Sequence, residues 1–293
     1  MPDANRRAAL VIFIILTLIW GTSFILIKQG LKVFSPDEVG ALRVVAASLF
    51  LMPLALTRLK ELKSGSHYGK LFASGMLGVF IPSFLFATAQ THMESSVAGV
   101  LNTLTPIFTM IIGAILFHQR FRAMAIAGIV LGFAGAVLLS MSRAGGTIGG
   151  VNLYALLIVL ACFCYGSNLN LIKFKIPDLS ALTITSVALL LVGPVAILYL
   201  LGFTEFLPKL TTQPGAWQAC GFVVLLGLMS TAVAMFLFNK LVKVSTPLFA
   251  SSVTYAIPLV AVLWGLLDHE QLSWGHLAGM ITIIAGVYLA NRK

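Results

Sequence analysis

The chain has 293 residues, of which 59% are hydrophobic and only 10% are charged. A soluble domain carries roughly 25% charged residues, so this composition excludes a soluble domain with a water-facing surface. The formal net charge of +10 would suit a protein that binds nucleic acid or an anionic surface, but its distribution along the chain favours a different explanation.

Long apolar stretches occupy most of the sequence. A membrane-spanning helix needs about 20 mostly apolar residues, and backbone amides in lipid must be paired within the segment, which favours helices. The alternation of apolar and polar residues that is typical of a membrane barrel is absent from the sequence. We therefore predict an all-α integral membrane protein with ten transmembrane helices, at approximately 8–29, 37–57, 68–90, 95–117, 122–142, 151–172, 178–202, 216–239, 245–267 and 273–291.

The first span follows Arg6 and Arg7, and basic residues before an apolar run also resemble the beginning of a signal peptide. Its apolar run, however, continues past Gly21 to Ile27 without a small-residue cleavage pattern before the next span. This pattern favours a first helix that is retained rather than removed.

Lysine and arginine residues are distributed unevenly between the two sides of the predicted membrane. With the N-terminus placed in the cytoplasm, fourteen lie on the inner side and four on the outer side, and Arg43 lies inside a span. Six of the nine acidic residues fall on the outer side. This positive-inside bias predicts a protein of the inner (plasma) membrane with both termini in the cytoplasm. It explains the basic excess without a nucleic-acid partner.

A sequence motif near residue 20 recurs near residue 165. TLIWGTSFILIKQG (17–30) aligns with CFCYGSNLNLIKFK (162–175) at an offset of 145. Further matches follow in order at offsets of 151 or 152, and they relate 84–86 to 236–238, 105–106 to 257–258, and the glycines at 128 and 135 to those at 279 and 286. We therefore predict two five-helix repeats, 1–145 and 146–293.

Each repeat contains an odd number of spans, so the second repeat must enter the membrane from the opposite side to the first. The two repeats are therefore inverted, and a pseudo-two-fold axis in the membrane plane relates them. Secondary transporters recurrently use this architecture, with the substrate site near the midplane between the repeats. Two similar halves of opposite orientation can exchange conformations, which predicts alternating access between inward-open and outward-open states.

The whole chain resembles the drug/metabolite transporter superfamily, specifically its EamA-type exporters. The resemblance is carried by the segment Trp20-Gly21-Thr22-Ser23, by Arg43, by the sites 105–106 and 257–258, and by the paired glycines. It implies export of a small metabolite, with amino acids, including aromatic ones, as the leading expectation. Many members carry a Gly-Glu pair after the fourth and ninth spans, whereas His118-Gln119-Arg120 follows the fourth span here.

Polar and aromatic side chains at depth in the spans form the candidate substrate site. Polar side chains are costly against lipid, so they are expected to face protein or a cavity. An aromatic surface with a few hydrogen-bonding groups suits a small amphipathic ligand, although hydrogen bonding between helices explains the same residues equally well. The predicted lining is Trp20, Ser23, Phe80, Ser83, Asn102, Tyr165, Asn168, Phe236, Thr254 and Tyr255, with core packing as the alternative for Tyr255.

Prolines and glycines within the spans each allow a structural and a functional interpretation. Pro106 and Pro258 are copies of each other and kink their helices, either as static bends or as hinges for gating. Gly21 and Gly166, which are also copies, serve either close helix packing or flexing during gating.

Three basic residues near or within the spans allow the same two kinds of interpretation. Lys28 and Lys173 are copies near opposite membrane faces, where they either snorkel to lipid headgroups or act as electrostatic gates. Arg43 lies about six residues into the second span, roughly 9 Å deep. The family resemblance implies a fixed structural pair for it, with Glu94 or Asp37 as the partner.

The sequence contains no reactive cluster of the kind that an enzyme needs. The five histidines are scattered near span ends, the three cysteines lack metal-ligand spacing, and no Walker loop is present. We therefore predict no catalytic residue, no metal site and no cofactor.

The placement of charge also bears on energy coupling. All nine acidic residues fall at helix ends or in loops, and arginine stays protonated at physiological pH, so no obvious proton carrier lies at the midplane. We expect a facilitator or exchanger of a small neutral or zwitterionic metabolite that works in the lipid bilayer, for which a monomer would suffice. Efflux of lipophilic drugs or nucleoside-like metabolites is the alternative, and a membrane scaffold or lipid-modifying enzyme is a third.

Overall fold

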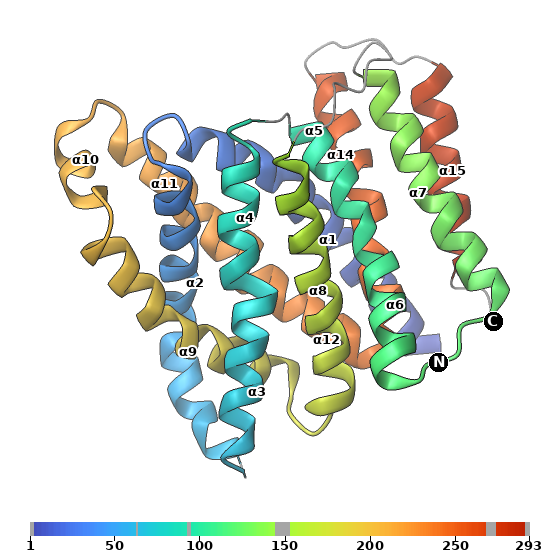
Figure 1. Cartoon of the computed structure of the whole chain (residues 1–293), viewed down its shortest axis with the longest axis horizontal. Helices are drawn as coiled ribbons and strands as arrows, with labels where there is room; N and C mark the ends of the chain where they lie inside the picture. The colour runs from blue at the N-terminus through green and yellow to red at the C-terminus, as the bar shows by residue number, and fades with distance from the viewer. Residues whose placement is uncertain (1–2, 63, 93–94, 144–152, 268–273, 291–293) are drawn as a thin grey trace.

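The computed structural model describes residues 3–62, 64–92, 95–143, 153–267 and 274–290. Within these residues all regular elements are helices. Figure 1 shows them as one bundle, in which the start of α1 (Asp3–Gly30) and the end of α15 (Trp274–Ala290) lie near each other. The face of the bundle that carries these two ends is termed the terminal face, and the other is termed the opposite face.

The helices occur in the same order in the two halves of the chain. The first half contains α1, α2 (Pro36–Arg58), α3 and α4 (Ser66–Gly75, Ile81–Ala89), α5 and α6 (Ser95–Leu101, Thr105–Phe117) and α7 (Ala123–Arg143). The second half contains α8 (Ala155–Lys175), α9 (Ala181–Gly202), α11 and α12 (Ala216–Leu226, Ala234–Val244), α13 and α14 (Pro247–Ser251, Val253–Leu267) and α15. The predicted all-α fold of two inverted five-span repeats is confirmed.

The surface of the bundle is apolar in the way that a lipid environment requires. Ile14, Leu198 and Ile281 are 58%, 66% and 67% exposed, and many other large apolar side chains are exposed as well. Seven helical segments of the described chain are long and apolar enough to cross a membrane, and three shorter apolar helices complete the series. A water-soluble monomer rarely exposes so much contiguous apolar surface, so the protein is a multi-pass membrane protein.

Two spans contain a π-helix at matching positions. The segment η2 (Met76–Phe80) joins α3 to α4, and η4 (Gly227–Val233) joins α11 to α12. In the first repeat Pro82 follows η2 and has no N–H to donate, which favours a local change of helix type. The second repeat has Ala234 at the equivalent position, so proline is not what creates η4. Short π-helices are rare and often occur at functional sites.

The fourth and ninth spans are also interrupted near their prolines. A 3₁₀ segment, η3 (Asn102–Leu104), separates α5 from α6, and Pro106 occupies the first turn of α6. There the missing N–H costs little. Pro258 instead lies inside α14, after the break between α13 and α14. The two prolines therefore occupy copied positions in the sequence but different positions within their helices.

The repeats interlock through glycines that allow close helix contact. A Cβ on Gly21 of α1 would lie 2.5 Å from the Cβ of Val260 in α14, and a Cβ on Gly166 of α8 would lie 2.8 Å from the N of Thr109 in α6. Each contact joins a helix of one repeat to a helix of the other. These distances support the packing interpretation of both glycines.

The helices α7 and α15, which are copies of each other, pack with their backbones in close contact. A Cβ on Gly128 would lie 2.2 Å from the N of Ala290, and one on Gly286 would lie 2.4 Å from the N of Gly132. These glycines therefore allow the two helices to pack closely. In Figure 1 the pair stands at one edge of the bundle, away from α2 and α9.

The structure extends two spans beyond their predicted ends. α8 continues from 172 to Lys175, and α12 continues from 239 to Val244. The added turns contain lysines, which polarity alone would place outside the membrane. Cations are nevertheless favourable at a helix C-terminus, because they bind the free carbonyls and interact with the helix dipole.

The short helix α10 (Phe206–Thr212) is a feature that the sequence analysis does not predict. It lies on the opposite face, where the Nζ of Lys209 is 2.9 Å from the Oε2 of Glu38 and the ring of Phe206 is 5.2 Å from that of Phe34. A helix of seven residues is too short to show a clear period in sequence. These contacts hold the start of α2 in place.

Candidate functional site

A cavity lies between the two repeats. Its walls come from α1, α2, α4, α6, α8, α12 and α14 and from the segments η2, η3 and η4. The cavity volume is about 70 Å³, and one water molecule needs about 10–15 Å³ by a similar measure. In this conformation the cavity therefore holds a small solute or a few waters.

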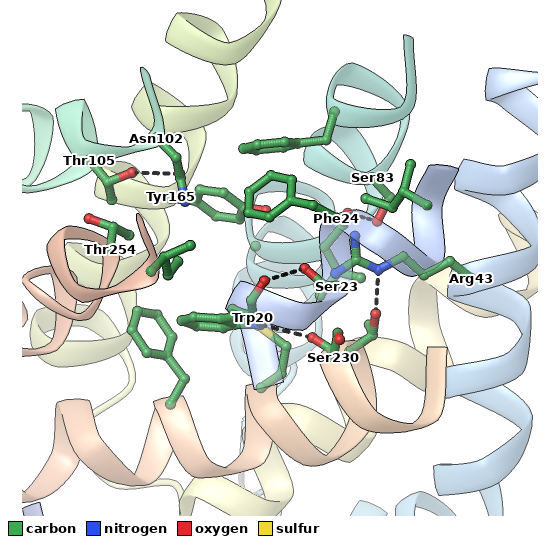
Figure 2. Close-up of a pocket in the computed structure, with 18 of the residues that line it drawn as sticks. Trp20, Ser23, Phe24, Arg43, Ser83, Asn102, Thr105, Tyr165, Ser230 and Thr254 are labelled. Atoms are coloured by element: carbon green, nitrogen blue, oxygen red, sulfur yellow. Dashed lines mark hydrogen bonds between the residues drawn. The ribbon is translucent and has the colours of Figure 1, made fainter. Parts of the chain in front are cut away.

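The structure brings seven of the ten predicted site residues to this cavity. They are Trp20, Ser23, Ser83, Asn102, Tyr165, Asn168 and Thr254. Figure 2 labels six of them, which come from several helices, and it shows the ring of Tyr165 extending toward Phe24 and the indole of Trp20 lying near Ser230. Residues that are far apart in the chain thus meet at one place between the repeats.

Three predicted site residues do not line the cavity. The fully buried Tyr255 donates its hydroxyl to the carbonyl O of Ile129 at 3.0 Å and packs between helices, which was the alternative expectation for it. It follows Thr254 directly, so it is rotated by about 100° around the helix. Phe80 packs against Phe84, with their ring centroids 4.8 Å apart.

Phe236 is the third residue that the cavity lining does not include. Phe238, two positions further along the same helix, lines the cavity together with its copy Phe86. Two residues on a helix are about 200° apart. The predicted residue therefore belongs to the motif that contributes to the cavity lining, but it lies on another face of the helix.

The lining is built almost entirely from residues that the repeat relates. Sixteen of its nineteen residues form eight copied pairs, at an offset of 145 for the first and eighth helices and 152 for the others. The pairs are Trp20 with Tyr165, Ser23 with Asn168, Gly78 with Ser230, Val79 with Thr231, Ser83 with Met235, Phe86 with Phe238, Asn102 with Thr254, and Thr105 with Ile257. Phe24, Ile27 and Arg43 have no copy in the lining.

The π-helix η4 accepts hydrogen bonds from two cavity residues of the first repeat. The Nε1 of Trp20 donates to the carbonyl O of Ser230 at 3.0 Å, and the Nε of Arg43 donates to the Oγ1 of Thr231 at 2.6 Å. Figure 2 shows both bonds on the same side of the cavity. Ser230 and Thr231 are not among the predicted site residues, and neither are their copies Gly78 and Val79 at the 152-residue offset, so the repeat gave no signal for either pair.

Arg43 does not form the ion pair that the family resemblance implied. Among the described residues none of the ion pairs includes Arg43. Asp37, one of the two suggested partners, instead accepts a hydrogen bond from the hydroxyl of Tyr199 at 3.3 Å. Glu94, the other, lies outside the described residues. The pairing with Asp37 is therefore wrong, and Arg43 faces the cavity.

None of the described acidic residues contributes to the cavity lining. The lining, all of which is described, contains no Asp or Glu. The buried Glu38 belongs to the first turn of α2, where it pairs with Lys209 and accepts from the backbone N of Ser35. In the described part of the chain no three His, Cys, Asp or Glu residues are close enough together to hold a metal ion.

The ends of α8 and α12 on the terminal face are joined by two reciprocal lysine contacts. The Nζ of Lys173 donates to the carbonyls of Val242 at 3.2 Å and Ser245 at 2.8 Å, at the end of α12. The Nζ of Lys243 donates to the carbonyls of Ile176 at 2.7 Å and of the following Pro177 at 2.9 Å, beyond the end of α8. We term these contacts the lysine clamp.

The copies of these lysines on the opposite face are different. Lys28, the copy of Lys173, is exposed, and the position equivalent to Lys243 at the 152-residue offset is Thr91. Snorkelling to headgroups therefore remains a suitable interpretation for Lys28. For Lys173 the bonds to α12 favour a role in holding two helices together.

Comparison with a family model identifies the architecture twice in the chain. The EamA-like transporter family matches residues 7–141 and again 152–292. A crystal structure of a protein with 20% sequence identity superposes with a TM-score of 0.75 and covers 97% of this chain and 96% of that one. At this identity the structural likeness supports the fold alone.

Several relatives match over nearly the whole chain. An uncharacterized transporter of Archaeoglobus fulgidus is 28% identical over 278 residues, which cover 94% of this chain and 95% of the relative. The uncharacterized inner membrane transporter YedA of Escherichia coli K12 is 26% identical and covers 88% and 82%, and the protein PecM of Dickeya dadantii is 26% identical and covers 93% and 89%. The chain therefore belongs to the EamA-like transporter family.

Proposed function

We propose that this membrane transporter exports a small metabolite by alternating access through the cavity between its repeats. The observation that carries the proposal is the lining of eight copied residue pairs, because a site between inverted repeats keeps the same walls when the repeats exchange conformations. The proposed repeats are 1–145 and 146–293. The lysine clamp would close the terminal face in the conformation seen here.

The proposed setting is the inner (plasma) membrane, with the terminal face in the cytoplasm. The distribution of lysine and arginine supports this orientation, and one relative is described as an inner membrane transporter. In this orientation the lysine clamp lies on the cytoplasmic side. The cavity residues contributed by α1 begin at Trp20 and continue toward the outer side as far as Ile27.

Amino acids are the leading substrate class in this proposal. The cavity combines the aromatic rings of Trp20, Tyr165 and Phe238 with the polar groups of Asn102 and Asn168, which suits a small ligand with both apolar and polar parts. Its volume of about 70 Å³ fits a small solute, and an aromatic amino acid would require the cavity to widen. Lipophilic drugs are the alternative substrate class. They fit this cavity less well, because it is small and its lining contains many polar groups.

The mechanism we propose is facilitated transport or exchange, driven by the gradient of the substrate itself. It rests on the absence of acidic residues from the cavity lining, since proton coupling usually employs an ionisable group inside the membrane whose protonation competes with substrate. Arg43 stays protonated at physiological pH and cannot take that role.

Flux through purified protein in liposomes tests the proposal. A mixture of amino acids and other metabolites is loaded inside, and their release is followed by mass spectrometry at equal pH on both sides and with no membrane potential. We expect release of at least one metabolite class. The variant Ser23→Trp should block it by filling the cavity, and Ser167→Trp, on the exposed side of α8, should not.

Two results would contradict the proposal. Release that is equal in the parent protein, in Ser23→Trp and in protein-free liposomes would exclude transport through the cavity. Uphill accumulation driven by an imposed pH gradient alone, and abolished by a protonophore, would exclude a simple facilitator or exchanger and indicate proton coupling.

A further inference from the structure

The guanidinium of Arg43 is a charged group in the membrane interior, and no acidic residue in the described part of the chain forms an ion pair with it. It lies on α2 about 10 Å from the helix start at 1.5 Å per residue, and it lines the cavity. Charged side chains at such depth normally pair with an opposite charge or mark the path of a substrate or ion. No acidic residue lines the cavity, all of whose residues are described.

The hydrogen bonds of Arg43 leave most of its donors available. A guanidinium has five N–H donors, and the described contacts use one, the Nε bond to the Oγ1 of Thr231. Figure 2 shows the side chain reaching from α2 toward Ser23 and Ser230, with its terminal nitrogens directed to the cavity. The bond to Thr231 fixes the plane of the guanidinium and presents its Nη groups to whatever occupies the cavity.

A second, independent observation lies beside it on η4. The hydroxyl of Ser230 is buried and has no hydrogen-bond partner, although its backbone O accepts from Trp20. Buried hydroxyls are nearly always paired. Ser230 belongs to the cavity lining, so a ligand in the cavity would supply the missing partner.

These groups together match a carboxylate. Arginine binds carboxylates through two parallel N–H···O bonds, which its planar fork fits well, and a hydroxyl can donate a third bond. A single positive charge neutralises a monoanion. The surrounding rings of Trp20, Tyr165 and Phe238 contact organic groups rather than a bare inorganic ion.

We propose that Arg43, with the hydroxyl of Ser230, is the anchoring site for a carboxylate of the substrate. The transported metabolites are then small organic carboxylates, and amino acids bind through their carboxylate end. This inference rests on the proposed transport function, because it names the class of substrate that is transported. Carboxylate binding itself can be measured without transport.

The test uses Trp20 as a reporter in the purified full-length protein. Replacing Trp217, Trp264 and Trp274 by Phe leaves Trp20 as the sole tryptophan, since the chain has four. Its emission is titrated with propionate and with propionamide, which have the same size, and then with L-alanine and L-alaninamide. Sodium chloride and inorganic phosphate provide the comparison with inorganic anions.

We expect saturable changes with propionate and L-alanine at concentrations at least about tenfold below those needed for the two amides. Arg43→Gln should weaken propionate binding by about tenfold or more, because a hydrogen bond to a charged group is lost. Arg43→Lys should bind at an intermediate level, since it keeps the charge but not the fork. Ser230→Ala should weaken binding about threefold and leave the Trp20 bond to the backbone intact.

Equal responses to acid and amide, unchanged propionate binding in Arg43→Gln, or saturation by chloride or phosphate but not by carboxylates would each overturn the proposal. If Arg43→Gln fails to fold, the acid and amide titrations of the parent protein and of Ser230→Ala decide. Carboxylate binding without any flux in liposomes would refute the transport function alone. Flux of other solutes without carboxylate binding would refute this site alone.

Discussion

The two repeats build the cavity from the same positions but with different chemistry. Where the first repeat has Gly78 and Val79 in its π-helix, the second has the hydroxyls of Ser230 and Thr231. Only the first repeat contributes a charged side chain to the lining, which is Arg43. Its Nε donates a hydrogen bond to the Oγ1 of Thr231 in the second repeat. In the proposed mechanism, the copied backbone would give two conformations of similar energy, and the differing side chains would orient the bound ligand.

The two faces of the bundle show the same contrast. On the terminal face Lys173 and Lys243 join the ends of α8 and α12, whereas on the opposite face the equivalent residues are the exposed Lys28 and Thr91. Contacts present on one face only stabilise the conformation that contains them. In the proposed mechanism, this difference between the repeats would set the balance between the two access states.

Substitution of the copied glycines should have the largest effect, because both copies meet the other repeat closely. Gly166→Ala would place a methyl group 2.8 Å from the backbone N of Thr109, and Gly21→Ala would place one 2.5 Å from the Cβ of Val260. We expect each to destabilise the protein by about 1–3 kcal/mol through overpacking. Thermal unfolding in detergent measures the loss.

The control for these glycine variants is Gly221→Ala, since nothing lies within 4 Å of a Cβ at that position. Alanine favours a helix by about 1 kcal/mol over glycine, so this variant should be as stable as the parent or more so. If Gly21→Ala and Gly166→Ala behave like Gly221→Ala, the repeats are not interlocked by these contacts.

Breaking the lysine clamp should have the next largest effect and should act on one face only. Lys173→Met combined with Lys243→Met removes four charge-assisted bonds to carbonyls. We expect a loss of about 1–2 kcal/mol for the state closed at the terminal face, after allowance for partial exposure of the lysines. A cavity cysteine should then react about tenfold faster with an impermeant thiol reagent added on the terminal side.

Lys28→Met is the matched control for the clamp, since it removes the copied lysine on the opposite face. It should leave the rate from the terminal side unchanged. Equal rates in the clamp variant and in Lys28→Met would show that the clamp does not hold that face closed and that Lys173 only snorkels.

The copied prolines should give a smaller effect, and an unequal one. Pro258 lies inside α14, whereas Pro106 lies in the first turn of α6. Pro258→Ala restores a helical hydrogen bond worth about 1 kcal/mol, which should slow exchange of the substrate about fivefold. Pro106→Ala should slow it less, because an N–H in the first turn has no helical partner. Parental rates in both variants, measured in liposomes, would show that the kinks are static.

The repeat explains how much of the site could be predicted from the sequence. Four cavity residues could be predicted because the same motif occurs in two segments: Trp20, Ser23, Tyr165 and Asn168. Aligning the two segments shows which residues are equivalent and therefore which helix face they share. The span order and the approximate span ends followed from hydropathy, since lipid selects apolar helices. Both kinds of signal depend on patterns that extend over many residues.

The features that were missed depend on local geometry or on the absence of a copy. A π-helix rotates the residues that follow it around the helix axis, relative to a regular α-helix. Phe236 was therefore expected at the cavity, where Phe238 lies. Tyr255 follows Thr254 by one residue, and a spacing pattern does not resolve that rotation. Arg43 has no basic copy, so the repeat gave no indication that it faces the cavity. The short α10 is fixed by Lys209 and Phe206, whose partners are distant in the chain.

The central claim is that one cavity between the repeats is reached from each side of the membrane in turn. The direct measurement places Ser23→Cys in a protein whose three native cysteines are replaced by alanine, and applies an impermeant thiol reagent to either side of sealed vesicles. Ser167→Cys, on the exposed side of α8, is the control. The account predicts that the cysteine at position 23 reacts from both sides and that the control reacts from neither. Reaction at position 23 from one side only, or from neither in folded protein, would contradict it.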